Sequence, residues 1–196
     1  MSVIYKSVND AIADINKGKV GILPTDTLYG LVVKASNKLA VSKMYNLKLR
    51  RNKPGTLVAS DINQLVDLGL KKRYLQAVEQ FWPGAVSVIV PTGAFLGYLH
   101  QGKYSLAVRI PEDKELQKLL LATGPLLTTS ANLPNQQPAR NISEAQKYFG
   151  KTVDFYVDGG ELAGEPSTVI RVVDDAIEVL RQGKVIINEE TGAIIK

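Results

Sequence analysis

Residues 19–31 read KVGILPTDTLYGL, an apolar run, a polar loop and a second apolar run. The first run, Lys19 to Leu23, has the length and composition of a short buried strand, and Pro24 ends it. Leu28 to Val33 returns as a second strand. The polar loop between them therefore follows the carboxyl end of a strand, where open α/β sheets usually bind ligands.

The rest of the chain switches between helical and extended apolar spacing, which predicts one α/β domain over residues 1–196. The run from Ser7 to Asp10 has the pattern of a capping box, which opens a helix that Gly18 ends. Further helices are expected at 39–49, 112–122 and 141–149, and further strands at 57–59, 86–90, 106–110 and 126–129 and near Phe155, Val169 and Val179.

The composition excludes several classes of chemistry. The chain has no Cys and a single His, His100, which is expected in a surface loop. Without Cys, disulfides, thiolate catalysis, zinc fingers and iron–sulfur clusters are excluded. One His also excludes a His-rich metal site, and a Ser-His-Asp triad elsewhere on the chain. Any reaction must depend on hydroxyls, amides, carboxylates and fixed cations.

The charge is uneven along the chain. The net charge is +5, made of +9 up to Ile110 and −4 after it. The stretch from Lys34 to Lys53 holds seven cations and no acid, which indicates either a solvated helix face or a surface for nucleotide or RNA phosphates. No apolar run reaches the roughly 18 residues of a membrane span, and the first residues lack the apolar core of a signal peptide. We therefore predict a soluble, cytoplasmic protein.

The usual glycine-rich phosphate loops, G-x-x-x-x-G-K-[ST] and G-x-G-x-x-G, are missing from the sequence. Side chains and isolated helix ends must then hold any phosphate. The loop after the first strand holds three hydrogen-bonding side chains and a Tyr, which suit a small polar pocket: Thr25, Asp26, Thr27 and Tyr29. Thr, Asp and Gly are also ordinary turn residues, so the loop alone leaves both interpretations open.

Two further clusters contain polar residues at i,i+2 spacing. Lys48 and Arg50 end the helix at 39–49, where cations compensate the helix dipole or, in an extended exit, share a face and clamp a polyphosphate. Ser130 and Asn132 follow an apolar strand. They offer donors and acceptors for a base, ribose or α-phosphate, or they simply cap a helix or make an Asx turn.

A fourth group is scattered in sequence. Arg109 ends a strand, Ser167 and Thr168 follow Pro166, and Arg181 precedes a Gln-Gly pair. Singly, such residues lie on the surface more often than in a site. Together they would add two cations and two hydroxyls.

The sequence resembles the YrdC-type threonylcarbamoyl-AMP synthases. The motifs run in family order over residues 24–183, which is most of the chain, and none of them is decisive alone. They are PTDTLYGL (Pro24 to Leu31), KLR (Lys48 to Arg50), FWPGAVSVIV (Phe81 to Val90), SLAVRIP (Ser105 to Pro111), TTSAN (Thr128 to Asn132), PAR (Pro138 to Arg140), PSTVI (Pro166 to Ile170) and LRQG (Leu180 to Gly183).

The resemblance implies the YrdC/RibB-like fold, a single-domain twisted mixed β-sheet flanked by helices. It also implies a nucleotidyltransferase reaction in which L-threonine, bicarbonate and ATP give threonylcarbamoyl-AMP and pyrophosphate, for the threonylcarbamoyl modification of adenosine 37 in tRNA. ATP is the substrate, with Mg²⁺ on its phosphates and no metal held by the protein. Possible partners are tRNA or double-stranded RNA and downstream threonylcarbamoyl-transferase proteins.

Motif position implies two groups of site residues. The residues expected to hold ATP are Lys48, Arg50, Ser130, Asn132, Arg140 and Arg181. Lys48 and Arg50 are also expected to be catalytic. Those expected around threonine, with Arg109 as the partner of its carboxylate, are Thr25, Thr27, Tyr29, Arg109, Thr129 and Ser167.

The chain departs from the family pattern in three places. Arg51 replaces a proline common after the K-x-R arginine, the strand from Leu57 to Ser60 lacks a His found in some relatives, and one extra residue precedes Pro138. The chain also resembles the short form of the family, without an extra C-terminal domain. Non-synthase paralogues tend to lack K-x-R and S-x-N, and both are present here. The alternative is a related module that binds structured RNA without catalysis.

Overall fold

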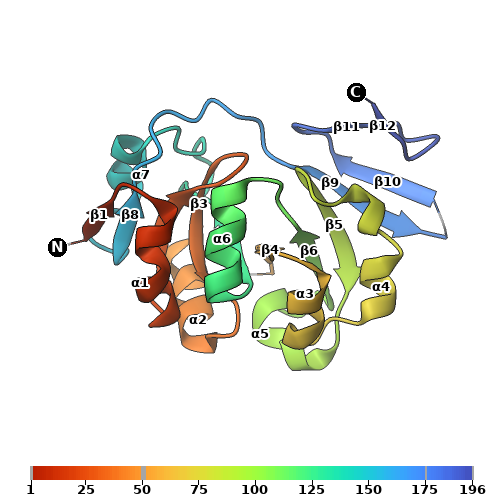
Figure 1. Cartoon of the computed structure of the whole chain (residues 1–196), viewed down its shortest axis with the longest axis horizontal. Helices are drawn as coiled ribbons and strands as arrows, with labels where there is room; N and C mark the ends of the chain where they lie inside the picture. The colour runs from red at the N-terminus through yellow and green to blue at the C-terminus, as the bar shows by residue number, and fades with distance from the viewer. Residues whose placement is uncertain (1, 50–51, 175, 196) are drawn as a thin grey trace.

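The computed structural model describes residues 2–49, 52–174 and 176–195. Among them, ten strands form one mixed sheet: β1 (Val3–Tyr5), β2 (Gly21–Pro24), β3 (Tyr29–Lys34), β4 (Thr56–Val58), β5 (Val86–Pro91), β6 (Ser105–Arg109), β7 (Leu126–Ser130), β8 (Phe155–Val157), β9 (Thr168–Val173) and β10 (Ala176–Arg181). Their order across the sheet is β1-β8-β2-β3-β7-β4-β6-β5-β9-β10. The twisted mixed sheet confirms the predicted fold class (Figure 1).

The opening stretch KVGILPTDTLYGL folds as predicted, into two antiparallel strands joined by the polar loop. Gly21 pairs with Val32, and Pro24 pairs with Tyr29. Successive side chains of a strand point to opposite faces. Accordingly, the side chains of Ile22 and Leu31 pack in one core, and those of Leu23 and Val32 pack in a second core on the other face.

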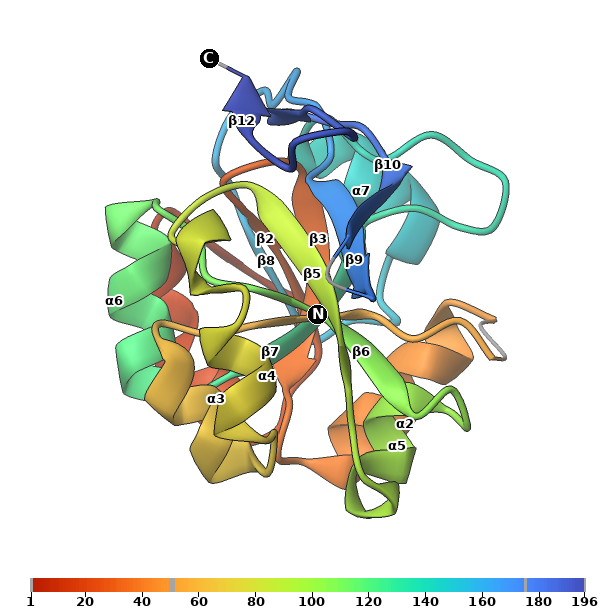
Figure 2. The same ribbon diagram turned by 90° about the vertical axis from the view of Figure 1, so that its right-hand side faces the viewer.

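Helices cover both faces of the sheet: α1 (Ile12–Asn16), α2 (Lys38–Leu47), α3 (Ile62–Leu68), α4 (Lys72–Gln76), α5 (Gly97–His100), α6 (Lys114–Thr123) and α7 (Ile142–Phe149). Figure 2 shows α6 and α2 on opposite sides of the strands. Leucines of α6 pack with Ile15 of α1, whereas Val41 and Met44 of α2 belong to the other core. The capping box at Ser7 is confirmed, and it opens a short 3-10 turn that leads into α1.

The predicted elements are confirmed to within about two residues, but the sequence missed others. Strand β1, helices α3 and α4, and a C-terminal hairpin of β11 (Ile186–Ile187) and β12 (Ile194–Ile195) were not expected. All are shorter than the window of about 11 residues over which helical spacing is read, or than the roughly 4 to 8 residues expected of a strand. Among the described residues, no helix has the length and apolar composition needed to cross a membrane.

The placement of His100 in a surface loop was wrong. The side chain is 2% exposed and ends α5. Its Nδ1 atom accepts hydrogen bonds from the backbone N–H groups of Gly102 and Tyr104, at 3.1 and 3.2 Å. His100 therefore fixes the turn between α5 and β6.

Candidate functional site

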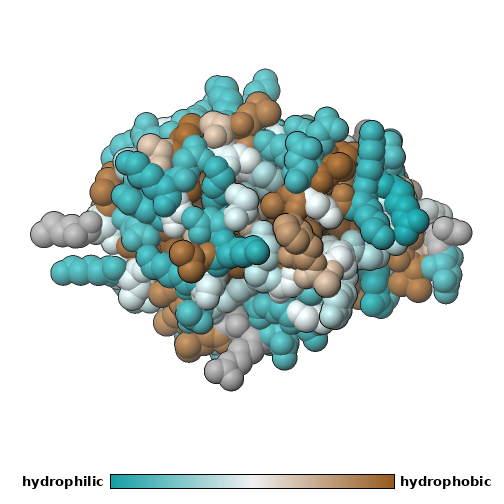
Figure 3. Space-filling view, turned by 90° about the horizontal axis from the view of Figure 1, so that it is seen from below, coloured by the Kyte–Doolittle hydropathy of each residue, from teal (hydrophilic) through white to brown (hydrophobic). Residues whose placement is uncertain are grey.

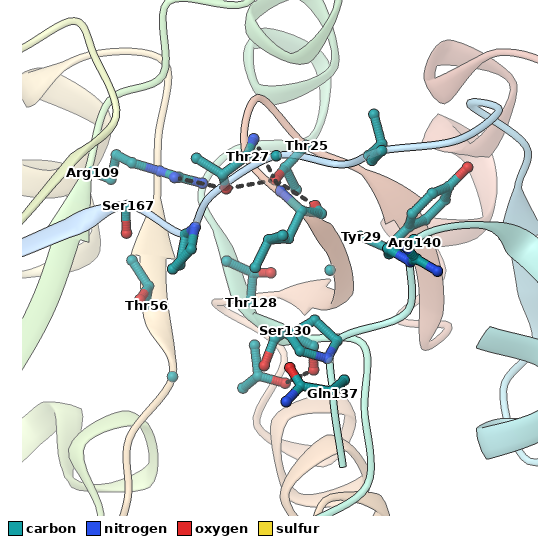
Figure 4. Close-up of a pocket in the computed structure, with 18 of the residues that line it drawn as sticks. Thr25, Thr27, Tyr29, Thr56, Arg109, Thr128, Ser130, Gln137, Arg140 and Ser167 are labelled. Atoms are coloured by element: carbon teal, nitrogen blue, oxygen red, sulfur yellow. Dashed lines mark hydrogen bonds between the residues drawn. The ribbon is translucent and has the colours of Figure 1, made fainter. Parts of the chain in front are cut away.

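A cavity of about 1030 Å³ opens over the middle of the sheet. Nine of the twelve predicted site residues line it: Thr25, Thr27, Tyr29, Arg109, Thr129, Ser130, Arg140, Ser167 and Arg181. Figure 4 shows seven of these by name, converging from the loop after β2, from β6 and β7, and from the segments before α7 and β9. Residues far apart in sequence therefore share one site, as predicted.

The cavity floor is formed by three neighbouring strands. Thr56 of β4 pairs with Ala107 of β6 on one side and with Thr128 of β7 on the other. Because β6 runs parallel to β4 and β7 runs antiparallel to it, moving two residues along each strand leads in opposite directions. Arg109 and Ser130 consequently lie toward opposite ends of the floor. The cavity thus spans the sheet between an Arg109 end and a Ser130 end.

At the Arg109 end, a guanidinium and a carboxylate form a closed pair. Arg109 Nη2 lies 3.0 Å from Asp26 Oδ1, and the two side chains are 4% and 10% exposed. Arg109 Nη1 donates to Thr27 Oγ1 at 3.2 Å, and Thr27 Oγ1 lies 3.1 Å from Thr25 Oγ1. The Nε atom of Arg109 is buried without a hydrogen-bond partner among the described residues. Thus Arg109, Thr25 and Thr27 form one network, which the sequence assigned to threonine.

Burial dominates the electrostatics of this end. It raises the pKa of Asp26 above its ordinary value, although Arg109 pulls in the other direction. Burial also lowers the pKa of Arg109, opposed by Asp26 and reinforced by the positive charge of Arg181. Both charges are thus held in a poorly solvated position. Such positions are common at sites that bind or transform ligands.

Ser167 is held from two sides. Its Oγ lies 2.9 Å from Ser87 Oγ, and Ser87 is completely buried. Arg181 Nη2 donates to the Ser167 carbonyl at 2.7 Å. The fourth sequence group, Arg109, Ser167 and Arg181, therefore comes together as expected. Ser87 was missed because a serine in an apolar strand carries no signal by itself.

At the Ser130 end, the lysine of K-x-R contacts the residues of S-x-N. Lys48 is 4% exposed, and its Nζ donates to the Ser130 carbonyl and to Asn132 Oδ1, both at 2.8 Å, and to the Asn132 carbonyl. Ser130 Oγ also donates to Asn132 Oδ1 at 2.7 Å, so both side chains point the same way as predicted. Lys48 and Asn132 do not themselves line the cavity. Arg50 lies outside the described residues.

A strap of irregular chain, residues 158–167, joins β8 to β9 (Figure 1), and several of its residues line the cavity. The Tyr29 hydroxyl donates to the Gly160 carbonyl at 2.9 Å and accepts from the Gly159 N–H at 2.8 Å. Gly164 packs so closely on the Thr27 carbonyl that a Cβ atom would overlap it. Tyr29 is fully buried and anchors this strap, a role that the sequence did not indicate.

This chain resembles proteins of known family in sequence and in structure. A family model for Sua5, YciO and YrdC proteins, described as "Telomere recombination", matches residues 13–183. The chain belongs to this family. It is 32% identical over 173 residues to a putative threonylcarbamoyl-AMP synthase of Methanocaldococcus jannaschii (87% of this chain, 82% of that protein). It is 35% identical over 173 residues to the threonylcarbamoyl-AMP synthase of Blochmanniella pennsylvanica (84% of this chain, 88% of that protein).

A solved member of the family has the same fold. The crystal structure of P. abyssi Sua5 complexed with L-threonine superposes with a TM-score of 0.81 at 24% identity. The match covers 94% of this chain and 58% of the Sua5 chain, so this chain spans little more than half of that relative. The match extends the family assignment to the arrangement of strands and helices.

In this family member, the basic stretch from Lys34 to Lys53 is largely tied to the protein itself. Lys34 donates to Asn16, Lys43 pairs with Asp154, and Lys38 lies over the rings of Phe95 and Tyr98. Tyr45, the one aromatic residue of the stretch, is buried, with its hydroxyl bonded to the Leu99 carbonyl. The underside of the molecule, where α2 and α5 lie, mixes hydrophilic and hydrophobic side chains (Figure 3). These contacts favour a solvated helix face over a stacking surface for RNA.

Proposed function

We propose that this chain makes threonylcarbamoyl-AMP from L-threonine, bicarbonate and ATP with release of pyrophosphate, for the threonylcarbamoyl modification of tRNA. The observation that carries the proposal is the two-ended cavity. One end offers a guanidinium and hydroxyls, which suit a small amino acid. The other end is lined by Ser130, which forms hydrogen bonds with Lys48 and Asn132 behind it. The volume of about 1030 Å³ accommodates two small substrates together. The named synthase relatives support the same reaction.

The reaction needs no nucleophile from the protein. The amine of threonine attacks the carbon of bicarbonate, with loss of water, or that of CO₂, with loss of a proton, and gives a carbamate. A carbamate oxygen then attacks the α-phosphorus of ATP, and the bond to pyrophosphate breaks. The protein holds the reactants together and stabilises the charge that develops on the phosphate. A chain without Cys and with its one His buried far from the cavity lining meets that requirement.

We assign the substrates to the two ends by charge and hydrogen bonding. Arg109 would pair with the threonine carboxylate, while Thr25, Thr27, Thr129 and Ser167 surround the rest of the amino acid. Lys48, with Arg50, would act on the phosphates as the catalytic pair. Ser130, Asn132 and Arg140 complete the nucleotide site. Arg181, which its motif assigns to ATP, lies beside Ser167 at the Arg109 end. Mg²⁺ bound to the ATP phosphates would neutralise part of their charge; among the described residues, no three acidic or His side chains cluster as a metal site requires.

Pyrophosphate release tests this proposal directly. We expect release in the presence of ATP, Mg²⁺ and bicarbonate to depend on L-threonine. Replacing Lys48 with Met should lower turnover by about 100-fold or more, the usual cost of removing a group that stabilises transition-state charge. Lys43→Met is the matched control, because Lys43 belongs to α2, which Lys48 caps, but pairs with Asp154 at the surface. Release without threonine, or full turnover by the Lys48 variant, would contradict the proposal.

Several predictions of the sequence remain proposals. We expect one catalytic domain over residues 1–196 and a cytoplasmic protein. Direct contact with tRNA or double-stranded RNA, and transfer of the product to downstream threonylcarbamoyl-transferase proteins, also stay predictions. The non-catalytic RNA-binding alternative is the less favoured, because the relatives matched over most of the chain are named synthases.

A further inference from the structure

The chain continues beyond residue 183, where the family match ends, and its next residues contact the cavity walls. Lys184 donates through its backbone N–H to the Pro166 carbonyl and through Nζ to the Asp26 carbonyl, both at 2.9 Å. Pro166 belongs to the wall that carries Ser167, and Asp26 belongs to the loop that carries Thr25 and Thr27. One residue therefore joins two walls of the site.

The position of Lys184 is fixed by its neighbours. Gly183 donates to Thr168 Oγ1 at 2.9 Å and lies so close to the Pro166 carbonyl that no Cβ would fit. Gln182 bonds the backbone of Ile187 through both ends of its amide, at 2.8 and 3.3 Å, and Ile187 is buried. The backbone at Lys184 is thus held on both sides, and its side chain reaches Asp26 from a fixed origin.

Asp26 connects this outer contact to the site. Its backbone carbonyl accepts from Lys184, and its carboxylate lies 3.0 Å from Arg109 Nη2. Asp26 itself does not line the cavity, whereas Arg109 does. Because Asp26 contacts Arg109 directly and Lys184 contacts Asp26, we take their influence on a substrate to pass through Arg109.

We propose that Lys184 and Asp26 are positioning residues that hold the Arg109 guanidinium toward the carboxylate of the amino-acid substrate. The segment after residue 183 thereby sets the affinity for that substrate without touching it. The inference rests on the proposed function, because it takes Arg109 as the carboxylate partner. It adds a role for Lys184, which lies outside the motifs and the family match.

Because the cavity has two ends, substitutions at Lys184 or Asp26 should affect amino-acid binding selectively. Lys184 and Asp26 contact the Arg109 end, while the Lys48, Ser130 and Asn132 cluster lies at the other. Loosening Arg109 should weaken amino-acid binding and leave nucleotide binding unchanged. A merely structural defect would instead weaken both.

The test compares KM for threonine with KM for ATP in full-length variants. Lys184→Met removes one hydrogen bond and should raise KM for threonine by about 2- to 10-fold. Asp26→Asn, which keeps the side-chain shape, should raise it by about 30-fold or more because a charged partner is lost. Lys184→Arg should restore most of the affinity. The control is Lys118→Met, since Lys118 pairs only with Glu115 on the exposed face of α6.

The outcomes separate the two proposals. Wild-type protein without threonine-dependent turnover would refute the proposed function, whatever the variants do. Normal wild-type turnover with Lys184→Met and Asp26→Asn unchanged in KM for threonine would refute the positioning role alone. An equal rise in both KM values would also refute it. Calorimetric titration with threonine in the absence of ATP gives a second readout, in which the same variants should bind more weakly.

Discussion

Two buried aspartates in this molecule pair with cations and behave in opposite ways. Asp14 of α1 lies 2.8 Å from Lys19, and Asp26 lies 3.0 Å from Arg109. The aspartate side chains are similarly buried, at 8% and 10% exposure. Their cations differ, because the Lys19 side chain is 41% exposed and that of Arg109 is 4% exposed. One pair reaches water, and the other lies inside the cavity wall.

The leading cause of the pKa shift differs between the two carboxyl groups. The hydrogen bond from Lys19, assisted by one from Tyr5, holds the pKa of Asp14 below its ordinary value. Burial raises the pKa of Asp26 despite its guanidinium partner. The charged form of Asp14 therefore stabilises the fold, whereas the charged form of Asp26 costs free energy. A pair that costs stability is expected where function requires it.

The largest expected effect comes from removing Arg109. Arg109→Met leaves Asp26 buried without its cation, which typically costs about 3–5 kcal/mol of unfolding free energy. Threonine-dependent turnover should fall by about 100-fold or more, because the carboxylate partner is lost. Urea unfolding and pyrophosphate release measure the two quantities.

A double variant separates fold from function at this pair. Adding Asp26→Asn to Arg109→Met removes the unpaired charge and should recover most of the stability but none of the turnover. Recovery of turnover would show that Arg109 acts only through the fold. Equal and additive losses of stability would show that the two side chains are not coupled.

Much of the fold was predictable because local signals agreed with tertiary packing. Side chains of the two strands between Lys19 and Val33 point alternately into the two cores, and the cap at Ser7 starts a helical segment. Short elements escaped detection. Strand β1 has three residues and α4 has five, so their existence depends on partners elsewhere in the chain rather than on their own pattern.

Nine of the twelve residues expected in the site line one cavity, but the geometry of that cavity was not predictable. The motifs placed Lys48, Ser130 and Asn132 in one expected ATP site, and the structure brings these three residues into contact. It did not indicate that Asp26 pairs with Arg109, 83 residues later, or that Tyr29 anchors the strap. Spacing within one element reports which side chains share a face. Whether residues on two distant strands meet depends on the order and direction of the strands in the sheet.

A smaller effect is expected at the first aspartate. Asp14→Asn removes a charge-assisted hydrogen bond and should lower the free energy of unfolding by about 1.5–3 kcal/mol. Turnover and both KM values should stay at the wild-type level, because Asp14 lies outside the cavity lining. Urea unfolding at neutral pH measures the loss. A change in KM for threonine would mean that Asp14 also influences the site. It would contradict the distinction between a structural aspartate and a functional one.

The smallest effect is the pH dependence, in which the two aspartates should have opposite signs. Since the pKa of Asp14 is lowered by folding, its contribution is complete above the unfolded pKa of about 3.9 and is lost as the pH falls through the folded value. The folded pKa of Asp26 is raised, so the folded state takes up this proton first and gains stability as the pH falls through that value.

Comparing each Asn variant with wild type isolates these contributions. Between neutral pH and about pH 3, the wild-type advantage over Asp14→Asn should shrink, and the stability of wild type relative to Asp26→Asn should rise. Each unit of pKa shift corresponds to about 1.4 kcal/mol at most. Urea unfolding of the three proteins across this range measures both differences. If both differences moved in the same direction with pH, the pairs would not differ in solvation, and the cost of the Asp26 pair would need another origin.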